Sequence, residues 1–259
     1  MSTTRYMVII LLVALAYPVT LKAQNSQRVD IYKKVGQLDL VKVIFPDTVT
    51  NGYDYRARHE IVGYIDTNYQ RFQIHFTSIT QNPENPYQYF LKGKTKVRNN
   101  ICDFEGTLKV LSSTKFDSVE TMVDIGPTNF KIGEIRSEIV LNEERSQQFS
   151  GSIKGNLYTS ILIDTMGRLQ YNAFHLEVSD GYCNNQFTGV WTSYTTGKSR
   201  KCNWGDYRIP DCGDLDMGAG FFSPADKYLK NGWLTYRAMI NNKPEDQEAI
   251  RVENAEWWK

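Results

Sequence analysis

Four cations stand at every second position of one short segment, and this spacing could bind a polyanion. They are Lys92, Lys94, Lys96 and Arg98. Alternate side chains of a strand share one face, so the four charges would form a row roughly 20 Å long at about 3.3 Å per residue. The row could follow an anionic polysaccharide. It could also be a solvent-facing surface, on which lysine discourages unwanted pairing between sheet edges.

A loop rich in aspartate and glycine offers a second group of candidate ligands. Asp211, Asp214 and Asp216 supply carboxylate oxygens of the kind that Ca²⁺ prefers. Only Asp214-x-Asp216-x-Gly218 resembles part of an EF-hand loop, and no suitably spaced glutamate follows. Because Asp and Gly also form ordinary turns, the cluster indicates either a weak calcium site or a structural loop. We expect no other metal or cofactor.

Three short segments resemble motifs of jelly-roll polysaccharide lyases of the alginate-lyase type. They are Gln73-Ile74-His75, Arg136-Ser137-Glu138 and Tyr228-Leu229-Lys230-Asn231-Gly232. The resemblance implies β-elimination on a uronate-containing glycan. It implies His75 and Tyr228 as base and acid, with Gln73 and Arg136 neutralising the uronate carboxylate. Such a reaction needs a base near the proton and a donor or cation for the developing enolate.

Aromatic side chains crowd the C-terminal third of the chain. Exposed rings there could stack on sugars or line a cavity for a small apolar ligand, and buried rings would close one end of the fold. We predict Trp204 and Tyr207 as ligand contacts, together with the basic row. Gly189-x-Trp191 resembles the Gly-x-Trp of lipocalins and related barrels that bind small ligands.

The N-terminus predicts export. Arg5 precedes an apolar run of ten residues, Met7 to Ala16, and Ala23 offers a small residue for cleavage. This order is typical of a secretory signal peptide, and the run is too short to span a bilayer. We therefore expect a secreted or periplasmic protein, cleaved near Ala23, with no transmembrane segment after cleavage.

The cysteine count agrees with an oxidising compartment. Cys102, Cys183, Cys202 and Cys212 are the only cysteines of the chain, and all lie beyond the predicted cleavage point. An even number in an exported chain predicts two disulfides, for which three pairings are possible. The sequence does not choose among these pairings.

Charge and motifs exclude several classes of function. Loss of Arg5 and Lys22 with the signal would lower the formal net charge from +1 to −1, so the balance of charges gives no reason to expect nucleic-acid binding. The chain has no Gly-x-Ser-x-Gly nucleophile motif, phosphate-binding loop or dinucleotide fingerprint. The oligomeric state stays open.

Period-2 patterns of apolar and polar residues predict an all-β fold. Arg71 to Ile79 and Gln88 to Arg98 alternate clearly, and Phe-x-Gly opens three segments, at Phe104, Phe149 and Phe187. We expect one antiparallel meander, forming either a calycin-like barrel or a strongly coiled sandwich. Leu38 to Phe45 reads as its first strand and Trp233 to Ile240 as its last, with short helices near residues 225–231 and 244–258.

These patterns divide the chain into a signal peptide (1–23), a loose segment (24–36), a β core (37–195) and a loop-rich, disulfide-bearing extension (196–259) packed on the same domain. We expect a non-enzymatic exported protein. It would bind a glycan or a small hydrophobic ligand, or serve as a structural or interaction protein of the cell envelope. The alternative is a polysaccharide lyase acting on an anionic glycan.

Overall fold

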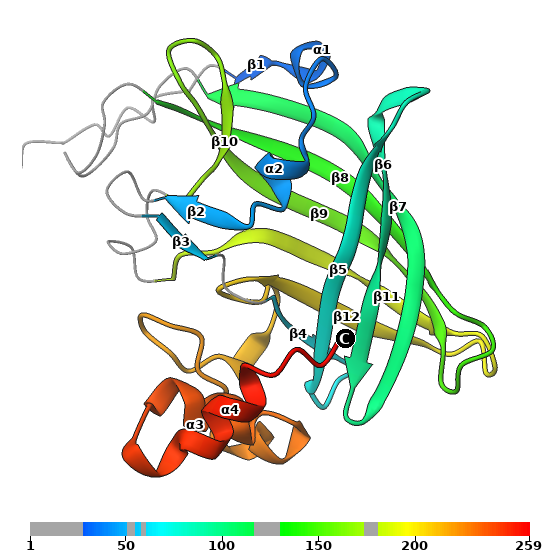
Figure 1. The fold of residues 1–259 in the computed structure, drawn as a ribbon, viewed down its shortest axis with the longest axis vertical. Helices are drawn as coiled ribbons and strands as arrows, with labels where there is room; N and C mark the ends of the chain where they lie inside the picture. Colours follow the sequence, from blue (N-terminus) through cyan, green and yellow to red (C-terminus); the bar gives the residue numbers. More distant parts are fainter. Residues whose placement is uncertain (1–27, 51–54, 58–60, 117–129, 174–180) are drawn as a thin grey trace, which may run out of the picture.

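The fold is a ring of eight antiparallel strands (Figure 1). A computed structural model describes residues 28–50, 55–57, 61–116, 130–173 and 181–259. The predicted signal peptide lies outside these residues. The strands follow one another around the ring in this order: β4 (Val62–Ile65), β5 (Gln70–Asn82), β6 (Asn85–Val97), β7 (Asn100–Phe116), β8 (Lys131–Glu143), β9 (Gly151–Ile163), β11 (Asn184–Ser193) and β12 (Ser199–Asp206). Pairing of β12 with β4 closes the ring.

Short elements add to this ring. Strand β1 (Arg28–Asp30) extends the sheet beside β7, and β10 (Leu169–Tyr171) extends it beside β9. Strands β2 (Thr48–Thr50) and β3 (Tyr55–Ala57) form a separate two-stranded sheet. The expected class, a mostly antiparallel β fold with a few short helices, is confirmed. None of the helices among the described residues is long and apolar enough to cross a membrane.

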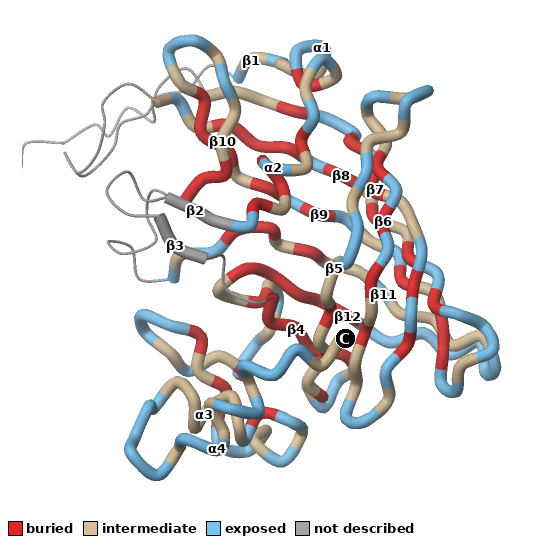
Figure 2. The backbone as a smooth tube through the Cα atoms, viewed as in Figure 1, coloured by how far each residue is buried: buried red, intermediate tan, exposed pale blue. Residues whose placement is uncertain are grey.

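The strand alternation read from the sequence separates the inside of the ring from the outside. On β6, Tyr89, Leu91 and Thr95 are buried, whereas Lys92 on the other face is exposed. Gly93 lies on the inner face, where an added Cβ would be 2.6 Å from the ring of Phe104 on the neighbouring strand. Figure 2 shows the buried positions recurring along the strands.

An N-terminal segment fills part of the interior. Helix α1 (Tyr32–Val35) contributes Val35 to the main apolar core, and α2 (Val41–Ile44), with Leu40 just before it, contributes Val43 and Ile44. The Leu40 amide donates to the Tyr89 hydroxyl at 3.0 Å, and Asn185 Nδ2 donates to the Ile44 carbonyl at 2.6 Å. The prediction of a strand at 38–45 is wrong, because the buried residues recur at helical spacing, i, i+3 and i+4.

The C-terminal extension, residues 207–259, packs on the outer face of the ring. Its own core joins Val62 and Tyr64 of β4 to Ile209, Leu215, Phe222 and Trp233. Its helical elements are η1 (Gly213–Leu215), η2 (Asp226–Asn231), α3 (Leu234–Asn241), η3 (Pro244–Asp246) and α4 (Gln247–Glu253). Residues 199–206, which the sequence placed in the extension, belong to the ring as β12. The strand predicted at 233–240 is α3 instead, whereas the helices expected near 225–231 and 244–258 are present as η2 and α4.

Candidate ligand-binding cleft

A cleft of about 640 Å³ lies between the ring and the C-terminal extension. It forms where β4 is short: β4 pairs with β5 only from Gln70 to Phe72. The next residues of β5, Gln73 and Ile74, border the cleft together with Ile61. The volume falls in the range of small-molecule sites, roughly 300–1,000 Å³.

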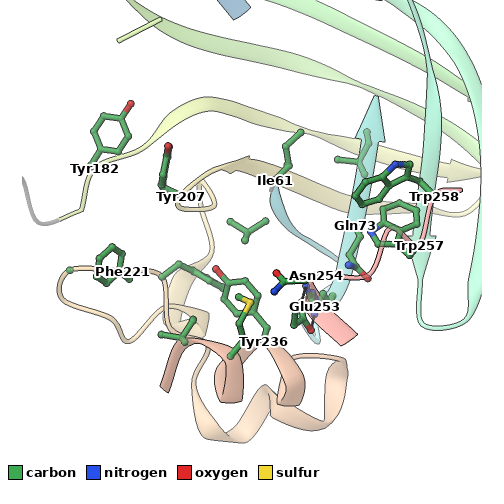
Figure 3. Close-up of a pocket in the computed structure, with 17 residues that line it drawn as sticks. Ile61, Gln73, Tyr182, Tyr207, Phe221, Tyr236, Glu253, Asn254, Trp257 and Trp258 are labelled. Carbon is green, nitrogen blue, oxygen red and sulfur yellow. Dashed lines mark hydrogen bonds and ion pairs between the residues drawn. The ribbon is translucent and has the colours of Figure 1, made fainter. Parts of the chain in front are cut away.

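Aromatic rings surround this cleft (Figure 3). Trp257 and Trp258 lie at one end, and Tyr182 and Tyr207 lie at the other with ring centroids 5.1 Å apart. Phe221 stands beside the cleft with 75% of its surface exposed. Exposed rings of this kind offer flat apolar surfaces, and the tyrosine and indole groups add hydrogen-bonding capacity at their edges.

The end of the chain, residues 253–259, runs across the outer face of β5 and β6, and we name it the C-terminal strap. The imidazole of His75 stacks on Trp258, with centroids 3.8 Å apart and planes 7° apart. The Lys96 ammonium lies 5.6 Å from the centroid of the Trp257 ring, within the range of a cation–π contact.

A buried ion pair joins the strap to the ring. Arg71 Nη1 and Nη2 each donate to one carboxylate oxygen of Glu253 at 2.6 Å. Burial raises the pKa of Glu253, but the hydrogen bonds from Arg71 and Thr235 and the charges of Arg71 and Lys96 outweigh it, so the pKa lies below its usual value. Besides this ion pair, the lining includes the uncharged amide side chains of Gln73 and Asn254.

A second buried ion pair positions the Phe221 loop. Arg208 bonds to Asp216 and donates to the carbonyls of Gly218, Ala219 and Gly220. Asp216 Oδ1 in turn accepts from the amides of Gly218 and Ser223 at 2.9 and 3.0 Å. The loop beside the cleft is therefore fixed by hydrogen bonds from its backbone to the side chains of Arg208 and Asp216.

Lys92, Lys94 and Lys96 of the basic row lie on the outer face of β6 as predicted, and acidic side chains compensate the first two charges. Lys92 pairs with Glu105 at 2.6 Å and Lys94 lies 3.6 Å from Asp103. Both acidic residues are on the neighbouring strand β7. Arg98 Nε donates to Gln70 Oε1 at 3.0 Å. Only Lys96 reaches the strap beside the cleft.

The candidate calcium ligands are directed to different partners. Asp214 accepts from Lys227 and from the Tyr228 hydroxyl, Asp211 lies 3.8 Å from Lys201, and Asp216 binds Arg208. Within the described ranges, no cluster of three or more His, Cys, Asp or Glu side chains could hold a metal ion.

The residues implied by the lyase resemblance are not brought together. Gln73 and His75 lie on the outer face of β5, and Tyr228 lies on η2 with its hydroxyl 2.7 Å from Asp214. Arg136 is on β8, where it bonds to Glu134 at 3.2 Å and contacts the ring of Tyr158. Three strand steps around the ring separate β8 from β5.

Of the two aromatic residues predicted as ligand contacts, only Tyr207 lines the cleft. Trp204 is 2% exposed and lies inside the ring between Phe187 and Phe72, with centroid distances of 3.6 and 5.7 Å. Its prediction as a contact is corrected, since alternation along β12 directs it inward.

The predicted disulfides are not found among the described residues. All four cysteines are free; Cys102 and Cys202 are buried and Cys183 is exposed. Cys102 lies opposite Thr95, and Cys202 lies opposite Ile65 and Gly189, so neither faces another cysteine across a strand pair. Cys212 precedes η1 in the extension.

Sequence reasoning missed the Arg71–Glu253 pair and the strap tryptophans. The only local signal was the Trp257-Trp258 pair itself, because two large apolar side chains in a polar segment are unfavourable in water unless they contact something. No protein-family model matches the chain, and neither the curated proteins nor the solved structures contain a significant match.

Proposed function

We propose that this chain is an exported, non-enzymatic ligand-binding protein whose cleft takes a carbohydrate. The observation that carries the proposal is the cleft itself, which combines a ring of aromatic side chains with the amides of Gln73 and Asn254. A sugar has an apolar face that suits Trp and Tyr rings, and hydroxyls that suit neutral amides. We further propose that the ring of strands is a calycin-like β-barrel.

The position of the cleft matters for this proposal. In small-ligand barrels the ligand occupies the interior. Here Leu40, Ile44, Trp204 and other core residues pack inside the ring. The cleft between the ring and the C-terminal extension is therefore the better candidate for the binding site.

The experiment is a titration of the protein with a panel of soluble neutral oligosaccharides, followed by tryptophan fluorescence and calorimetry. For an oligosaccharide that binds, Phe221→Ala should lower the affinity by about threefold to tenfold, which is the usual contribution of an aromatic contact. Phe149→Ala is the matched control, since Phe149 is 76% exposed and Phe221 is 75% exposed, and Phe149 is outside the cleft lining. No binding by any oligosaccharide, or equal loss in both variants, contradicts the proposal.

A small hydrophobic ligand is the second candidate. Met239 and Ile240 of α3 contribute an apolar part of the lining, beside Phe222. An apolar fluorescent dye should then bind and be displaced by an apolar ligand but by none of the sugars. Dye binding unchanged in Met239→Gln would count against this candidate.

A further inference from the structure

The carboxylate of Glu253 occupies the cleft in the way that a ligand acid would. Both of its oxygens accept from the guanidinium of Arg71, in the two-point geometry that recognises carboxylates most strongly. The side chains of Arg71 and Glu253 are only 13% and 5% exposed. Both residues line the cleft, so this buried pair borders the space available to a ligand.

A second cation, Lys96, lies near this ion pair. Lys96 lies on β6 directly opposite Gln73 of β5, close enough to Arg71 and Glu253 for their charges to act on it. Burial lowers the pKa of Lys96, and the repulsion of Arg71 lowers it further, with Glu253 acting in the opposite direction. The local charge therefore favours an additional or stronger anionic partner.

Little apolar packing fixes the segment that carries Glu253. Among residues 234–259, all of which the structure describes, no apolar residue is buried. The hold on the strap comes instead from the Arg71 pair, the Thr235 hydroxyl and the rings of His75 and Trp258. Segments with few buried contacts open at low free-energy cost, so the strap can exchange with a ligand.

We propose that Arg71 forms a binding site for the carboxylate of an acidic sugar, which displaces Glu253 from Arg71 while the neighbouring aromatic rings receive the sugar ring. The proposal rests on the proposed carbohydrate function and adds the charge of the ligand. Exchange of one carboxylate for another keeps the buried guanidinium paired, which avoids the large cost of leaving it alone. It also gives the cleft a means of distinguishing acidic from neutral sugars.

The test compares trigalacturonate with its methyl ester, on the wild type and on Glu253→Gln. The substitution preserves the shape of the side chain and removes its charge. We expect Glu253→Gln to bind the acid about tenfold more tightly than the wild type, because the internal competitor is weakened. Binding of the ester should be equal in both, and Arg71→Gln combined with Glu253→Gln should lose the gain. Equal affinity of wild type and Glu253→Gln for the acid would overturn the proposal.

Thr235→Val provides a second variant in case Glu253→Gln does not fold, as judged by circular dichroism. It removes a hydrogen bond to Glu253 and leaves every charge in place. It should increase the affinity for the acid by less than Glu253→Gln does, and an unchanged affinity overturns the proposal.

Benzoate, a carboxylate without a sugar, separates the carboxylate site from the carbohydrate function. If Glu253→Gln binds benzoate but neither sugar, the carboxylate site stands and the carbohydrate function fails. If both forms bind acid and ester alike, the function stands and the site fails.

Discussion

His75 and Trp258 lie face to face, with ring centroids 3.8 Å apart, and so join the end of the chain to the middle of β5. This contact brings a tryptophan of the strap to the edge of the cleft. His75, which the sequence suggested as a catalytic base, therefore has a structural partner 183 residues later in the chain.

Replacing His75 by Ala should loosen the strap. An aromatic pair contributes about 0.5–1.5 kcal/mol, so amide exchange in residues 255–259 should rise roughly twofold to tenfold. Hydrogen exchange followed by mass spectrometry measures this directly. His75→Phe retains a flat ring and should exchange like the wild type; equal exchange in His75→Ala would show that the stack does not hold the strap.

A tryptophan inside the ring and one on the strap should differ sharply in their effect on the free energy of unfolding. Trp204 is enclosed in the ring between Phe187 and Phe72, so Trp204→Ala should lower the free energy of unfolding by about 3–5 kcal/mol. Trp257 lies half-exposed on the strap, and Trp257→Ala should cost less than about 1 kcal/mol. Urea unfolding of both variants tests the pair. Similar losses would mean that the strap belongs to the cooperative core.

The sequence predicted the ring well because strand patterning is local. Alternation along β6 alone separates Leu91 and Thr95 from Lys92 and Lys94. The N-terminal segment inside the ring was predicted as a strand because residues 38–45 alternate over part of their length. The burial of Leu40, Val43 and Ile44 depends on strands that come later in the chain. Tertiary contact overrode the local pattern there.

The cleft could be predicted only in part, since its residues are far apart in sequence. Tyr207 was identified from an aromatic-rich segment, and Trp204, three residues before it, faces the opposite side of the ring wall. The Arg71–Glu253 pair joins positions 182 residues apart, and no local pattern links them. Compartment reasoning could not choose cysteine pairs, because it counts cysteines without knowing which strands are neighbours.

Thiol titration should distinguish free cysteines from disulfides. In the native protein, exposed Cys183 should react first with a thiol reagent. Cys102 should resist, because burial and the nearby charge of Glu143 raise its pKa to about 11 and the thiolate is the reactive form. Cys202 is fully buried and should behave similarly. In guanidinium without reductant all four cysteines should react, whereas a protein with two disulfides would have no reactive thiol.

A buried carboxyl inside the ring should make stability depend on pH. Glu143 accepts from Trp191 Nε1 at 2.9 Å, from the Gly151 amide at 2.7 Å and from the Thr95 hydroxyl, so it ties together four strands, β6, β8, β9 and β11. Burial raises its pKa above the usual value, although these hydrogen bonds act in the opposite direction. The folded state therefore binds this proton more tightly than the unfolded chain does.

Glu143 should accordingly stabilise the fold most at pH values below the pKa of an unfolded glutamate, about 4.3. That contribution is lost as pH rises through the higher pKa of the folded state. Glu143→Gln cannot ionise and retains hydrogen-bonding capacity, so its stability relative to the wild type should improve between pH 4 and pH 7 by on the order of 1 kcal/mol. Urea unfolding at the two pH values measures the difference. Glu144→Gln, an exposed neighbour, is the control and should show no such change. A constant difference between Glu143→Gln and the wild type would mean that Glu143 stays ionised in the fold.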